Sequence, residues 1–228
     1  MFSLVNRRLT SPVLVVGLGR FGSSVALTMV ERGREVLGVD ASAERVQHLA
    51  ERLTHAIQID TTDEEAMRQI GAPDFEQAIV AIGTDIESSA LTTSLLVDFG
   101  VNEIWAKAIS RDHGRILERI GAHHVVYPEA DMGERVAHLV SGAMLDYIQF
   151  DDGFALAKLE MKDSLGAGAL GDLQLRKRYG ITVVGFRAPN ASFTYADRDT
   201  VLEPGSLIAV AGRIEDVDRF AQEITSLT

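Results

Sequence analysis

Cysteine is absent from this 228-residue chain. Without it, the protein can have no disulfide, no thiolate metal ligand and no cysteine nucleophile. Long apolar runs are absent too, since no stretch approaches the roughly 18 apolar residues expected of a membrane span. Near the N-terminus, Arg7 and Arg8 follow the apolar residues, the reverse of a secretory signal. These absences predict a soluble protein of the cytoplasm.

Positive charge is also scarce. The chain has 22 Lys and Arg residues against 33 Asp and Glu residues, which gives a net charge of -11 at pH 7. Proteins that hold nucleic acid through their surface are usually basic, so we expect no nucleic-acid partner. Hydrophobic residues make up 46% and charged residues 24% of the chain, the ordinary usage of a globular protein.

Short apolar runs alternate with amphipathic stretches over residues 1–130. The runs predict strands at 13–17, 35–40, 55–60, 77–83, 102–109 and 123–128, with helical patterns between them. Strand–helix units in series indicate an α/β fold with a Rossmann-like, doubly wound parallel sheet.

The pattern changes after this domain. Residues 131–150 predict one linking helix, whose apolar side chains lie near one stripe: Met132, Val136, Leu139, Val140 and Ile148. Residues 151–228 then predict a small β-α-β-β-α domain. Its elements fall at 153–161, 171–180, 181–187, 202–212 and 215–227.

A glycine-rich turn opens the first helix. Gly17, Gly19 and Gly22 have the G-x-G-x-x-G spacing, and Phe21 lies between the last two. The first two glycines let the backbone approach a phosphate, and the third lets the helix pack on the strand. Asp40 ends the next predicted strand, where a carboxylate can accept hydrogen bonds from ribose hydroxyls. The pattern predicts an adenosine phosphate ligand.

Arg20 stands inside this turn, next to Phe21. A guanidinium can make a forked contact with terminal phosphate oxygens, and ATP carries more charge to neutralise than NAD does. Arg20 therefore favours ATP or ADP as the ligand. The alternative is an exposed arginine that pairs with a neighbouring carboxylate.

Other candidates lie at the ends of the later strands. Asp60 can contact the adenine side of a nucleotide or cap the following helix. Gly83 and Thr84 end the fourth strand, against which a Rossmann ligand would lie. Lys107 and Arg111 lie near the end of the fifth strand and can add positive charge near the phosphates, unless they are simply solvated.

Catalytic residues are harder to find. A Rossmann dehydrogenase needs a general acid or base beside the nicotinamide, yet no histidine follows Phe150. The sequence therefore favours binding over catalysis. An NAD-dependent oxidoreductase and an NAD(H)-binding redox sensor are the alternatives.

These motifs resemble the RCK family (regulators of K⁺ conductance), and in particular its KtrA/TrkA-type regulatory subunits. The resemblance is carried by VLVVGLGRFGSSVA, QID, AIG, WAKA, RIGAHHVVYPEADMG and LEPGSLIAVAG. It implies an RCK N-lobe and C-lobe, ATP or ADP binding, and no enzymatic activity. It also implies a homodimer that assembles into an octameric ring. The ring would lie at the inner face of the membrane, bound to a K⁺-translocating subunit of the KtrB/TrkH type.

The resemblance also implies roles for single residues. Arg20 matches an arginine that reaches the terminal phosphate, Asp40 the ribose ligand, and Lys107 the lysine of the KA segment. Glu129 matches an acidic residue beside which Mg²⁺ or another cation can sit near the phosphates.

In the C-lobe, Arg176 matches an arginine that reaches cyclic di-AMP. Thr182 stands where the family pattern has asparagine, so an exposed arginine at the end of a helix is the alternative.

Overall fold

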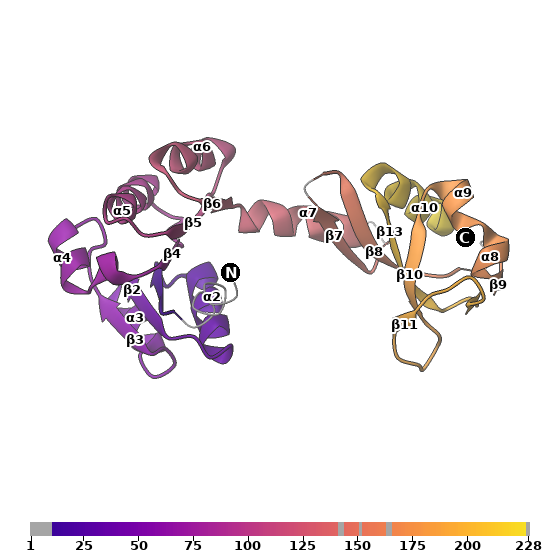
Figure 1. Cartoon of the computed structure of the whole chain (residues 1–228), viewed down its shortest axis with the longest axis horizontal. Coiled ribbons are helices and arrows are strands. Elements are labelled where there is room, and N and C mark those ends of the chain that lie inside the picture. Colours follow the sequence, from indigo (N-terminus) through magenta and orange to yellow (C-terminus); the bar gives the residue numbers. More distant parts are fainter. Residues whose placement is uncertain (1–10, 141–143, 151, 163–165, 227–228) are drawn as a thin grey trace, which may run out of the picture. The chain divides into compact units, whose positions relative to one another are not determined.

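The computed structural model describes residues 11–140, 144–150, 152–162 and 166–226. It divides into two compact units, Met1–Glu129 and Ala130–Thr228. Figure 1 labels most of the elements of each. Within the described part of the chain, no helix has both the length and the apolar character needed to cross a bilayer.

The first unit is built on a six-stranded parallel sheet with the order β3-β2-β1-β4-β5-β6. The strands are β1 (Val13–Val16), β2 (Val36–Asp40), β3 (His55–Gln58), β4 (Gln77–Val80), β5 (Glu103–Lys107) and β6 (His124–Val126). The predicted Rossmann-like, doubly wound sheet is confirmed. Every residue of β1 and β2 is buried, as expected of parallel strands covered on both faces.

Helices cover both faces of this sheet, and the side chains of β1 alternate between them. Val13 and Val15 pack in one apolar cluster with α2 (Arg20–Glu31) and α3 (Ala43–Leu49). Leu14 and Val16 pack in the other, with α4 (Glu64–Gln69), α5 (Ile86–Asp98) and α6 (Arg111–Ile120). A 3₁₀ turn, η1 (Ala72–Asp74), follows α4.

The linking segment differs from its prediction. α7 (Pro128–Val140) begins at a proline, which suits a first helical turn because its missing N–H is not needed there. The single helix predicted for 131–150 is wrong at its end, because Asp146–Phe150 forms β7. Its antiparallel pairing with the neighbouring residues 154–158 makes it a strand, and within it Tyr147 is buried whereas Ile148 is 49% exposed. Residues 141–143 and 151 lie outside the described residues.

The second unit holds a five-stranded antiparallel sheet with the order β11-β10-β13-β8-β7. Its strands besides β7 are β8 (Phe154–Glu160), β10 (Thr182–Arg187), β11 (Thr194–Tyr195) and β13 (Leu207–Arg213). A small pair, β9 (Gly168–Ala169) and β12 (Val201–Leu202), lies outside it. The helices are α8 (Leu170–Leu173), α9 (Leu175–Tyr179) and α10 (Ile214–Ser226).

The predicted β-α-β-β-α order corresponds to β8, α8 with α9, β10, β13 and α10. The apolar side chains of α10, Val217, Phe220 and Ile224, are buried in the core of the unit. The sequence analysis missed β7 and the three two-residue strands, which are too short to show a periodic pattern.

Candidate functional site

The carboxyl ends of the central strands surround a cavity of about 1110 Å³ in the first unit. It lies beside β1 and β4, where the strand order reverses, which is the usual ligand position in an open α/β sheet. The predicted residues that line it are Gly17, Gly19, Arg20, Phe21, Asp40, Asp60, Gly83, Thr84, Lys107 and Glu129.

The glycine turn forms the floor of this cavity. Gly17 has a φ of +90°, and a Cβ at Gly22 would lie 1.8 Å from the Gly17 carbonyl oxygen. Gly22 does not line the cavity but allows the turn to close beneath it. Gly19 is different, because a Cβ there would meet no atom within 4 Å. No side chain caps α2 at Gly19, so the first N–H groups of the helix are available to an anion.

Asp40 holds this turn against the end of β2. The Leu18 N–H donates to Asp40 Oδ2 (2.6 Å), and the Ser42 N–H donates to Oδ1 (2.8 Å). Arg45 lies on the open side, with its Nη1 3.4 Å from Oδ2. Asp40 is 6% exposed, so its carboxylate is a fixed part of the cavity wall.

Lys107 and Glu129 form an ion pair that lines another side of the cavity. Lys107 Nζ lies 2.6 Å from Glu129 Oε1, and the Lys107 side chain is 11% exposed. The hydrogen bond from Lys107 holds the pKa of Glu129 below its usual value, and the charge of Arg20 acts in the same direction. Lys107 also lies 5.8 Å from the centre of the Phe21 ring.

Asp60 follows β3 at the rim of the cavity. Its Oδ1 accepts hydrogen bonds from the Thr62 hydroxyl (2.7 Å) and the Thr62 N–H (2.9 Å), which lower the pKa of Asp60. The residue that caps α4 is Asp63, which accepts from Glu65 and Ala66. Asp60 is therefore not the cap, and the cavity-lining position is the one observed.

Besides Gly22, two predicted residues are absent from the lining of this cavity. The Arg111 guanidinium stands 5.3 Å from the centre of the Tyr127 ring. Arg176 belongs to the second unit, where its Nε donates to Thr182 Oγ1 (2.9 Å). Within the first unit, Arg111 is therefore not part of the cavity lining.

The sequence analysis missed the side of the cavity formed by α3. Glu44, Arg45 and His48 line it. Arg45 lies five residues after Asp40 in the sequence, and the first turn of α3 places its guanidinium next to the Asp40 carboxylate. The signal was present as the helix cap at Ser42, which fixes where α3 begins.

Known protein families match segments of both units of the chain. The TrkA-N domain model matches residues 13–128, and the TrkA-C domain model matches residues 169–225. The chain is 35% identical to the Ktr system potassium uptake protein C of Bacillus subtilis (strain 168), over 92% of this chain and 96% of that one. This chain belongs to the KtrA/TrkA-type RCK family.

Two further proteins are similar to this RCK chain. The Ktr system potassium uptake protein A of Bacillus subtilis (strain 168) is 36% identical over 92% of this chain and 95% of that one. The solved GsuK RCK domain aligns with a TM-score of 0.64 at 18% identity, covering 97% of this chain. This chain spans 52% of that longer chain, and the likeness shows the fold.

The described residues of this RCK chain do not form a metal site by themselves. Among the described residues, no three His, Asp or Glu side chains come together as metal ligands. Glu129 offers one carboxylate. That number fits Mg²⁺, which is commonly held by one or two carboxylates together with phosphate oxygens.

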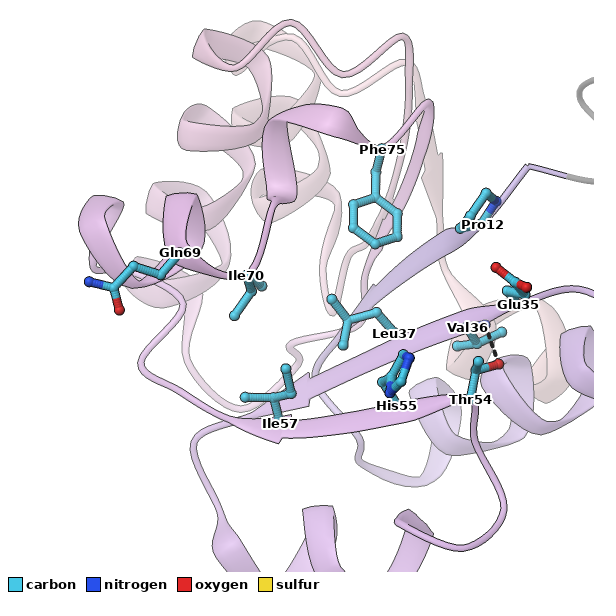
Figure 2. Close-up of a pocket in the computed structure, with 10 residues that line it drawn as sticks. All are labelled: Pro12, Glu35, Val36, Leu37, Thr54, His55, Ile57, Gln69, Ile70 and Phe75. Carbon is cyan, nitrogen blue, oxygen red and sulfur yellow. Dashed lines mark hydrogen bonds between the residues drawn. The ribbon is translucent and has the colours of Figure 1, made fainter.

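A second hollow of about 460 Å³ lies at the other end of the same sheet, at the starts of β2 and β3. Figure 2 shows Leu37, Ile57, Ile70 and Phe75 around it. None of the predicted site residues of this RCK chain lines it.

Proposed function

We propose that this chain is a nucleotide-sensing regulatory subunit of a potassium uptake system, and that it binds rather than transforms its ligand. The observation that carries the proposal is the cavity itself. There a glycine turn, the buried Asp40 and the cationic side chains of Arg20 and Lys107 converge at the switch point of the sheet. The Ktr system relatives supply the link to potassium.

The nucleotide that suits this cavity is ATP or ADP. The ribose would lie at Asp40 and the phosphates over Gly19 and the start of α2. The terminal phosphate would then meet Arg20 and Lys107, since both are cationic and line the same cavity. A cation such as Mg²⁺ would bind between the phosphates and Glu129.

Exchange of ATP for ADP would then act as a switch. A ligand shifts a conformational equilibrium only by its difference in affinity for the two states, and the γ-phosphate supplies such a difference at Arg20. In this proposal the chain forms homodimers within an octameric ring. The ring acts on a membrane K⁺-translocating subunit of the KtrB/TrkH type, which holds it at the inner face of the membrane.

Cyclic di-AMP would be a second regulatory ligand, bound by the second unit. Its support is Arg176, an exposed cation in the short helix α9. A cyclic dinucleotide would have to draw Arg176 away from Thr182.

The second candidate function is an NAD(H)-binding redox sensor. It is favoured by Asp40, because an acidic residue at the end of the second strand suits the adenosine ribose of NAD as well as that of ATP.

Calorimetric titration with ATP, ADP, NADH and NAD⁺, with and without Mg²⁺, separates the two candidates. Tighter binding of ATP that Mg²⁺ strengthens, without turnover, is the expected result. Binding of NADH with no response to ATP would overturn the proposal in favour of the redox sensor.

A further inference from the structure

The carboxylate of Asp40 has little accepting capacity left. Each carboxylate oxygen accepts about two hydrogen bonds. The Leu18 N–H (2.6 Å) and the Arg45 guanidinium (3.4 Å) use both accepting positions of Oδ2. The Ser42 N–H (2.8 Å) uses one of the two accepting positions of Oδ1. One position, on Oδ1, is open.

A ribose presents two neighbouring hydroxyls and needs two accepting positions to bind through both. Leu18 and Ser42 donate from the backbone, one in the glycine turn and the other at the cap of α3, so neither can withdraw without moving the loop that it belongs to. Arg45 is the donor that can leave.

The contact made by Arg45 is suited to exchange. It runs through one guanidinium nitrogen at 3.4 Å, longer than the usual 2.7–3.2 Å of a hydrogen bond. The Arg45 side chain is 51% exposed, whereas Asp40 is 6% exposed. A long side chain in solvent can swing aside while the carboxylate stays in place.

We propose that Arg45 competes with the nucleotide ribose for Asp40, and that this competition sets how strongly the site distinguishes ribonucleotides from 2′-deoxyribonucleotides. The inference rests on the proposed function, because it concerns the same cavity. A ribonucleotide must displace Arg45 to use both hydroxyls. A 2′-deoxyribonucleotide has one hydroxyl left, which the open position on Oδ1 accepts without displacement.

The test compares the dissociation constants of ADP and 2′-deoxy-ADP. In Arg45→Gln the ratio of the 2′-deoxy-ADP constant to the ADP constant should rise roughly two- to fivefold over wild type, the range expected of an exposed ion pair. The ratio is the proper measurement because the lost positive charge weakens both nucleotides alike. Arg45→Ala should raise the ratio as well.

Arg52→Gln is the matched control. Arg52 is exposed, follows α3 by three residues and does not line the cavity, so this variant removes the same charge and should leave the ratio unchanged. An unchanged ratio in both Arg45 variants, with ADP still bound, would overturn the inference alone. Failure of the wild-type protein to bind ADP would overturn the proposed function and the inference with it.

Discussion

Two hollows in the first unit lie at opposite ends of one sheet, and their linings differ in chemistry. The cavity at the carboxyl ends of the strands brings together Arg20, Lys107 and several carboxylates. The groove at the amino ends is lined mainly by apolar side chains, with Glu35 and His55 as its ionisable residues (Figure 2).

The difference follows from the direction of the chain. In a parallel strand–helix unit, each helix begins at the carboxyl edge of the sheet and points its first, unpaired N–H groups there. The glycine turn and the Asp40 carboxylate lie at that edge. At the amino edge the helices end, so no first-turn N–H groups are directed there. The same sheet therefore provides one end suited to an anion and one that is not.

The largest expected effect comes from Gly22→Ala, which tests how the cavity floor is built. The new Cβ would lie 1.8 Å from the Gly17 carbonyl oxygen and 2.9 Å from Ala81 Cβ, so the turn must move. We expect a loss of about 3 kcal/mol or more in the free energy of unfolding, measured by urea denaturation, and loss of nucleotide binding.

Gly19→Ala is the companion variant. At Gly19 a Cβ meets no neighbour within 4 Å and φ is -69°, so the variant should fold with wild-type stability. Its methyl group would stand where a phosphate approaches, and nucleotide affinity should fall at least about tenfold. If Gly22→Ala folds and binds normally, close packing of the turn is not what makes the cavity.

Arg20→Ala tests whether the positive charge of Arg20 in the cavity contributes to nucleotide binding. A charge-assisted hydrogen bond is worth about 1.5–3 kcal/mol, so ATP affinity should fall roughly 10- to 100-fold. ADP affinity should fall less, because only ATP carries the γ-phosphate. Calorimetry on His55→Ala, a variant of the apolar groove, should give wild-type affinities for both nucleotides. Equal losses of ATP and ADP affinity in Arg20→Ala would remove the role given to Arg20.

Part of this architecture is readable from the sequence. The buried apolar runs of β1 and β4 predict the sheet, and the glycine spacing predicts the floor of the cavity. Both features depend on residues that are close together in the sequence. The Lys107–Glu129 pair and the contact of Arg45 with Asp40 depend on how separate elements pack, which no local pattern reports. β7 was misread because Ile148 also falls at a helical spacing from Val140, and partnering with β8 decided the outcome.

The smallest expected effect comes from His113, a histidine beside the cavity, which we compare with His55 in the groove. His113 is 1% exposed, and its Nδ1 accepts a hydrogen bond from the N–H of Ile109, a cavity-lining residue (3.4 Å). Burial lowers the pKa of His113, so the folded protein takes up this proton at lower pH than the unfolded chain, whose value is about 6.5. Its contribution to stability is therefore complete above pH 6.5 and is lost as the pH falls toward the folded pKa.

Urea denaturation between pH 7.5 and 5 should show this loss, with a slope of at most about 1.4 kcal/mol per pH unit from His113. His113→Gln should flatten the slope. His55→Ala removes an exposed histidine from the groove and should keep it. A slope that persists in His113→Gln but disappears in His55→Ala would assign the pH dependence to His55 in the groove and not to His113.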